Sequence, residues 1–164
     1  MAEPRLVPRM QWPSYMNVGT PAAPEWELMG EGFTNLEKSV SPQEYTRHYV
    51  HEKSERRDVM GYSPEISFSL DMFTGHKTIA KIARVIDLEL IGSDAQVQIC
   101  SVNMYEESTT TPGEYVAYMR NWSIMPDSKG AGVDALQLAG SFAGVGDVIP
   151  GTWDDDTKTF TPVA

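Results

Sequence analysis

Two histidines and a carboxylate lie close together in the stretch His48-Tyr49-Val50-His51-Glu52. Zinc proteases carry H-E-x-x-H or H-x-x-E-H, and the order of residues here matches neither signature. A zinc site also needs three or four ligands, which a pair of histidines at i, i+3 does not supply. We therefore expect no metal ligand in this stretch.

A serine lies between glycines in Gly140-Ser141-Phe142-Ala143-Gly144. It is one position short of the G-x-S-x-G nucleophile elbow, and its surroundings predict a strand instead of a strand-to-helix turn. Gly140, Gly144 and Gly146 do not form G-x-G-x-x-G, and no lysine follows to bind phosphate. The glycines therefore predict neither a nucleophile nor a cofactor-binding loop.

Three consecutive carboxylates, Asp154, Asp155 and Asp156, are the remaining candidate for chemistry. Adjacent side chains point apart, whereas general acid-base catalysis needs two carboxylates that face each other across a cleft. Aspartate is also common at hairpin tips, where its side chain caps turn backbone. We expect no catalytic residue and no cofactor, and hence no enzyme.

The elements that carry these residues are short and mostly extended. Residues 133–142 alternate as in a half-buried strand, Gly144 and Gly146 predict a kink, and Pro150-Gly151 predicts a turn. Thr152-Trp153 then starts a short strand, Asp154–Thr157 forms an acidic tip and residues 158–160 return. This last third of the chain is typical of sheet assembly.

Three stretches, spaced along the chain, carry a family resemblance. In chain order they are Tyr15–Pro21 followed by Glu27–Thr34, then Tyr49–Ser54 running to Gly61-Tyr62, and last G-S-F-x-G-x-G-D-x-x-x-G-T-W-D…F-T from Gly140. Together they resemble the major tail tube proteins of long-tailed bacteriophages, of the Gram-positive phage or prophage type. The resemblance covers most of the chain.

Such proteins are structural. The resemblance implies hexameric rings in which each subunit adds strands to a continuous inner β-barrel, and rings that stack into a tube through which DNA passes without specific binding. It also implies a tape-measure protein, a tail tip or initiator and a tail terminator as partners. The protein would be made in the host cytoplasm and reside in the virion tail.

Contacts between subunits are expected at charged and aromatic positions. The hypothesis pairs the hairpin-loop residues Tyr49, Lys53, Arg56 and Arg57 with the acidic residues Asp154, Asp155 and Asp156 of a neighbour. Which acidic residues face the lumen is left open.

Composition agrees with a self-contained domain. The chain has 164 residues, 41% of them hydrophobic, enough to bury a core. Its single cysteine, Cys100, excludes an internal disulfide and is expected to be a small, half-buried strand residue. No apolar stretch predicts a signal peptide or a membrane span, so no membrane partner is expected.

Charge is uneven along the chain. Residues 1–84 hold 10 Lys/Arg and 11 Asp/Glu, whereas residues 85–164 hold 3 and 12, so nearly all of the net charge of −10 lies in the second half. An acidic surface disfavours gripping nucleic acid, because phosphate binding needs Lys and Arg. It is compatible with a wall along which DNA stays mobile.

The predicted architecture is mainly β: a β-sandwich or barrel of about eight strands with one flanking helix. Residues 1–25, rich in proline, predict an extended N-terminal arm with a short strand near Tyr15–Val18; residues 26–164 form a single β domain.

Residues 43–61 predict a long charged loop between two strand stems. The helix is expected at about 75–86, with Thr74 as N-cap, because Ile79, Ile82, Ala83 and Ile86 share one face. Further strands are expected at 26–29, 33–40, 66–70, 97–105 and 115–124, with a turn at 126–132.

Two alternatives remain. One is the inner tube of a contractile tail or phage-derived bacteriocin, which has the same fold class. The other is a monomeric β-sandwich that binds carbohydrate or another small ligand and stacks it on tryptophans: Trp12, Trp26, Trp122 and Trp153.

Overall fold

The computed structural model describes residues 3–163. It contains one α-helix, two short 3-10 helices and ten strands within that range. The elements are η1 Arg9–Gln11, β1 Ser14–Asn17, β2 Trp26–Leu28, β3 Phe33–Ser39, β4 Pro42–Arg47, β5 Arg56–Tyr62, β6 Glu65–Asp71, α1 Lys77–Leu88, η2 Gly92–Ala95, β7 Gln96–Glu107, β8 Tyr115–Ala131, β9 Gln137–Asp154 and β10 Thr159–Pro162. The expectation of a mainly β fold of the sandwich or barrel type with one flanking helix is confirmed.

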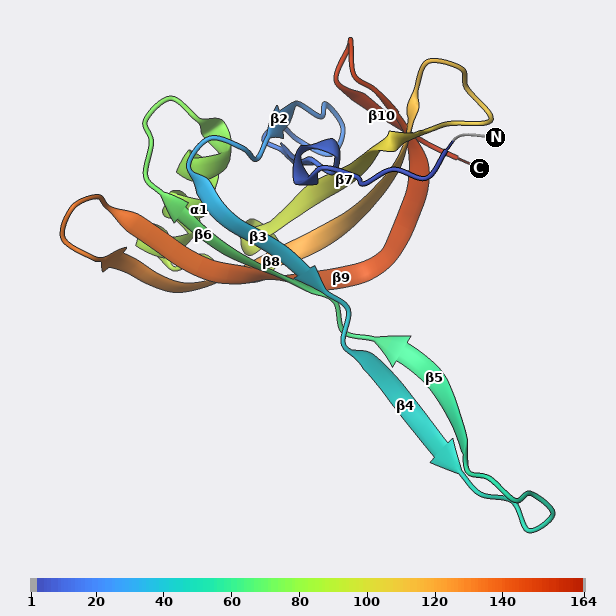
Figure 1. Cartoon of the computed structure of the whole chain (residues 1–164). Coiled ribbons are helices and arrows are strands. Elements are labelled where there is room, and N and C mark those ends of the chain that lie inside the picture. Colours follow the sequence, from blue (N-terminus) through green and yellow to red (C-terminus); the bar gives the residue numbers. More distant parts are fainter. Residues whose placement is uncertain (1–2, 164) are drawn as a thin grey trace.

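One curved sheet forms the body of the molecule. Its strand order is β2-β1-β7-β8-β9-β6-β3, and β10 pairs with the far end of β9. Strands β4 and β5 form a separate two-stranded sheet, which extends away from the body (Figure 1). All pairings are antiparallel.

Helix α1 covers one face of the sheet, here called the helix face. Ile79 and Ile82 of the helix are fully buried and pack in one cluster with Met16, Phe68 and further apolar residues of the sheet. Burial of apolar area stabilises a fold by roughly 25 cal/mol per Å², and this cluster is the larger of the two.

A second, smaller cluster lies on the opposite face, here called the open face. Neighbouring strand residues point to opposite faces, so Met16 and Tyr15 of β1 diverge. Met16 enters the helix-face core, whereas Tyr15 packs with Cys100, Val102 and Trp153. This explains why all four residues of β1 are buried.

The expected N-terminal arm needs a correction. The short strand near Tyr15–Val18 is confirmed as β1, but it lies inside the sheet, between β2 and β7, and not in an arm. Residues 3–10 are exposed, and Met1 and Ala2 lie outside the described residues. Pairing on both edges of β1 overrides the proline-rich composition around it.

Two predicted turns are wrong. Strand β8 runs through Pro126 and β9 runs through Pro150-Gly151, so the two strands connect at residues 132–136. At Pro126 the register shifts directly after the proline. Pro150 takes part in pairing through its carbonyl, which accepts the Val163 N–H at 3.0 Å. A proline that needs no N–H partner does not end a strand.

The predicted kink in the last third is confirmed. Between the pairs Asn121–Val145 and Met119–Ile149, strand β9 holds two more residues than β8. Gly146 has a φ of +74°, a backbone conformation that glycine adopts without a steric penalty. The resulting bulge bends β9 between its two halves (Figure 1).

The helix begins later than predicted. It spans Lys77–Leu88, and its N-cap is His76, not Thr74. Instead of a capping side chain from the preceding loop, the Glu27 carboxylate accepts the Thr78 N–H at 3.4 Å. The predicted buried face is confirmed for Ile79, Ile82 and Ala83.

Close packing of β10 on β9 yields a stability prediction. A Cβ at position 151 would lie 2.6 Å from the Phe160 ring and closer still to the Thr161 carbonyl oxygen. We therefore expect Gly151→Ala to destabilise the fold by about 1–3 kcal/mol, as overpacking does. Urea unfolding followed by tryptophan fluorescence measures this. Gly61→Ala is the control, since a Cβ at that position meets nothing within 4 Å; equal midpoints for both variants would contradict the packing.

Candidate assembly surfaces

The β4–β5 hairpin is almost entirely exposed. Every residue of β4 and all of β5 except Gly61 face solvent, including Val59 (53% exposed) and Met60 (70%). An isolated two-stranded hairpin is marginally stable at best in water. An element that buries so little in its own chain is suited to a partner's surface.

Two arginines of the hairpin form ion pairs within it. The guanidinium of Arg57 lies 2.7 Å from the Glu44 carboxylate, and that of Arg56 lies 2.7 Å from Glu52. The hydrogen bond and charge of Glu44 raise the pKa of Arg57, which stays cationic. Arg56 also lies 5.7 Å from the centroid of the Tyr49 ring. Lys53 is exposed at the tip.

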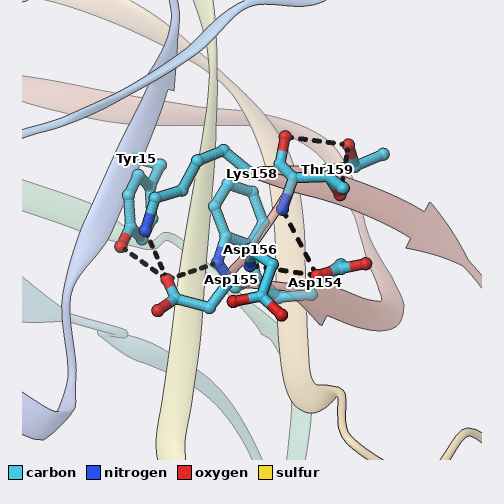
Figure 2. Close-up of polar contacts among 8 residues, drawn as sticks. Tyr15, Asp154, Asp155, Asp156, Lys158 and Thr159 are labelled. Carbon is cyan, nitrogen blue, oxygen red and sulfur yellow. Dashed lines mark hydrogen bonds and ion pairs between the residues drawn. The ribbon is translucent and has the colours of Figure 1, made fainter.

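The acidic tip is a tight turn between β9 and β10 (Figure 2). The Asp154 carboxylate accepts the backbone N–H groups of Asp156 at 3.0 Å and Thr157 at 3.3 Å, as the sequence predicted for a turn. Asp156 itself is exposed.

Asp155 joins this turn to the second core. Its carboxylate accepts hydrogen bonds from Lys158 at 2.6 Å, Trp153 at 3.4 Å and Tyr15 at 3.5 Å (Figure 2). The Lys158 hydrogen bond is the main reason why the pKa of Asp155 is lowered. Burial is the main reason why the pKa of Tyr15 is raised.

Within one chain the two predicted halves of the contact are apart. The hairpin and the β9–β10 turn extend from different ends of the molecule (Figure 1). The pairing of Lys53, Arg56 and Arg57 with Asp154–Asp156 of a neighbour therefore stays a prediction.

The part of the open face on β3, β6, β9 and β8 is polar and uncovered. On β6, Ile66, Phe68 and Leu70 are buried beneath the helix, so Glu65, Ser67, Ser69 and Asp71 point the other way. The register places these residues beside mostly small and polar partners on the neighbouring strands: Asn35, Glu37, Ser39, Gln137, Ala139, Ser141, Ala143, Ser123 and Ser128. Met125, which pairs with Ser141, is the large apolar side chain on this face.

Charge on this polar part has one sign. It carries the carboxylates of Glu37, Glu65 and Asp71, whereas Lys38 and Lys129 pair with Ile66 and Leu138 and so lie on the helix face. None of its residues in the four paired strands is Lys or Arg. The alternation on β6 is visible in the sequence, but the acidic surface arises only when the four strands lie side by side.

Two ends of the sheet are free edges. Strand β3 ends the order on one side and β2 on the other. Arg9 of the N-terminal segment donates to the Leu36 carbonyl at 3.0 Å and so covers part of the β3 edge. Free edges present unpaired backbone groups that pair readily with another chain.

Cys100 and the tryptophans are structural. Cys100 lies in strand β7, as expected, but it is fully buried instead of half-buried, and burial raises the pKa of its thiol to about 12. Trp122 and Trp153 are buried in the two cores, so neither offers a ring to a ligand. Trp26 packs edge-on against Trp153, with ring centroids 6.1 Å apart. The expected tryptophan platform of a ligand-binding sandwich is therefore wrong for Trp122 and Trp153.

Within residues 3–163, no three His, Cys, Asp or Glu side chains form a group suited to a metal ion. In the same range, no helix has the length and apolarity required to cross a membrane.

No family model matches the chain, and no curated protein matches it. Among solved structures, it is similar to a chain in the cryo-EM structure of the anti-feeding prophage (AFP) baseplate, 6-fold symmetrised. The TM-score is 0.49 with 9% identity, over 92% of this chain and 97% of the other. A likeness at this level supports no inference about function.

The Asp155 contacts yield a pH prediction. Because the pKa of this carboxyl is lowered in the folded state, its stabilisation is present above the ordinary aspartate pKa and is lost as the pH falls through the folded-state value. Asp155→Asn should lower the free energy of unfolding by about 1 kcal/mol or less at pH 7, since the pair is largely solvated. The difference from the unmodified chain should shrink as the pH falls from 7 to 2. Thermal unfolding across this pH range tests it, with exposed Asp156→Asn as the control; an equal loss at pH 2 and pH 7 would contradict it.

Proposed function

We propose that the chain is a structural subunit of a phage tail, which self-assembles into stacked hexameric rings and forms the tube through which DNA passes. The observation that carries the proposal is the β4–β5 hairpin, which leaves the body and exposes both of its faces. Such a hairpin gains stability when it packs on a neighbouring copy. The three sequence motifs that resemble tail tube proteins support this form of assembly.

The polar part of the open face supports the role of a conduit. Its side chains are mostly small, polar or acidic, with Met125 as the large apolar exception. Within the described residues, its three carboxylates, Glu37, Glu65 and Asp71, have no Lys or Arg beside them in the paired strands. A surface of this kind repels phosphate and does not retain a duplex. In the proposed tube this face lines the lumen, and the free edges of β2 and β3 lie where sheets of adjacent subunits meet.

The proposed partners follow from this role. The chain would bind copies of itself, a tape-measure protein, a tail tip or initiator and a tail terminator. The inner tube of a contractile tail or phage-derived bacteriocin is the alternative, and binding of a sheath protein to the outside of the assembled tube would distinguish it.

Hairpin variants test the proposal. We expect Val59→Asp with Met60→Asp to weaken assembly at least about tenfold, because two apolar side chains can no longer be buried at a contact. Negative-stain electron microscopy at rising concentration, together with the mass in solution, measures it. Thr109→Asp, in the exposed loop before β8, is the control.

The unmodified protein should form hollow tubes or rings of uniform width. A chain that stays monomeric at every concentration, with a tail-tip nucleus present, would overturn the proposal. Tubes formed equally well by the hairpin variant would remove the hairpin from the contact.

The charged contact has its own test. Arg56→Glu with Arg57→Glu should weaken assembly and reduce its salt dependence, if these residues face Asp154–Asp156 of a neighbour. Adding Asp156→Lys should restore part of the loss, since Asp156 is exposed and caps no backbone group. Assembly that is unchanged at all salt concentrations would exclude this pairing.

A further inference from the structure

A groove runs along the outer side of α1, beside the end of β1. Its volume is about 610 Å³. Apolar residues and cations share its lining: Val18, Ala80, Val85 and Leu90, with Lys77, Lys81 and Arg84, and one acid, Asp94.

The charge of the groove is positive in a chain that carries a net charge of −10. Lys77 pairs with Glu25 at 2.6 Å. Lys81 donates to the Asn17 carbonyl at 3.3 Å, and partial burial lowers its pKa. No carboxylate among the described residues forms an ion pair with Lys81 or Arg84. The groove therefore favours a segment that is both apolar and acidic.

The loop that joins β8 to β9 has this composition. Its residues 132–136 read Gly-Val-Asp-Ala-Leu, with Val133 98% exposed and Leu136 45%. Asp134 lies between the two apolar side chains and forms no ion pair within the described part of the chain. Nothing in the loop is basic. A nearly fully exposed valine next to a carboxylate matches the lining of the groove in both polarity and charge.

The loop does not reach the groove of its own chain. Lys129, near the end of β8, holds Asp87 at 2.6 Å on the flank of α1 that faces β8. The groove opens on the flank bordered by Val18 and Asp94. The loop extends past the body beyond α1 (Figure 1). Donor and acceptor thus lie on different flanks of one helix, which is the arrangement of a head-to-tail contact that can close into a ring.

We infer that the β8–β9 loop of one copy docks in the α1 groove of the next, with Val133 and Leu136 against its apolar lining and Asp134 facing Lys81 and Arg84. This contact rests on the proposed self-assembly and differs from the hairpin contact, since it joins neighbours within a ring.

Cysteine cross-linking tests the contact directly. Cys100 is buried and its thiol stays protonated, so introduced cysteines are the reactive ones. A Val133→Cys, Ala80→Cys chain treated with a short bismaleimide under assembling conditions should yield a ladder of covalent oligomers. Each single variant should remain uncross-linked beyond dimers. The matched control is Val50→Cys with Ala80→Cys, which places an equally exposed residue of the hairpin tip in the same test.

A charge exchange adds a second readout. Arg84→Glu should weaken association roughly fivefold, the upper range for one solvent-exposed ion pair. Combining it with Asp134→Lys should restore the association.

The outcomes separate the two proposals. A ladder from the Val133 pair alone, with rescue by the charge exchange, supports the contact. Tubes or rings without that ladder, or a ladder from the Val50 pair as well, overturn this contact and leave the tube proposal intact. A chain that neither cross-links nor assembles, even with a tail-tip nucleus, overturns the tube proposal and this contact with it.

Discussion

The antiparallel ladder between β8 and β9 is the constraint on which the rest of the structure depends. Residues 115–131 of β8 pair with residues 137–154 of β9. Strand β7 pairs with β8 and leads on to β1 and β2, whereas β6 and β10 pair with β9 and β6 leads on to β3. A ladder of this length is longer than the single helix that covers it. The part of the sheet beyond α1 must therefore be covered in another way. The bulge at Gly146 bends β9, and Trp153 in its far half packs against Tyr15 of β1.

Two cores result, on opposite faces. Near α1 the sheet buries Phe68, Leu138 and Phe142 beneath the helix. At the other end it buries Trp153 against Tyr15 on the open face, with ring centroids 4.3 Å apart. Strand β1 serves both cores, because its alternate residues point to the two faces. The acidic turn is attached to this second core through the hydrogen bonds of Asp155 to Tyr15, Trp153 and Lys158.

The arrangement of the strands also determines which surfaces of the molecule stay exposed. The polar part of the open face, the β4–β5 hairpin and the β8–β9 loop all lie where the sheet has no partner in its own chain. They differ in chemistry: the first is acidic with mostly small side chains, the second exposes aromatic and aliphatic side chains beside charged ones, and the third is apolar with one carboxylate. Surfaces so different suit different neighbours. For this reason we propose that the polar part of the open face lines a lumen and that the hairpin and the β8–β9 loop make separate subunit contacts.

The sequence by itself determined the features that depend on near neighbours in the chain. Periodicity identified the face of α1 that holds Ile79 and Ile82, alternation identified β6, and Gly146 marked the bend in β9. These signals suffice because a helix face, a strand face or a glycine φ is decided within a few residues.

Only the tertiary structure decided which strands pair and which surfaces that pairing leaves exposed. Pro126 and Pro150 are strong local turn signals, yet both lie inside strands. Pro126 pairs with Gly140 of β9 beyond the last β7 pair at Ser123, and Pro150 pairs with Tyr118 of β8. Asp155 meets Tyr15 across 140 positions of sequence, and Glu37 lies beside Glu65 and Ser67 only through the register of β3 on β6. Such contacts depend on long-range register, which the alternation of one strand restricts to a face but does not assign to a partner.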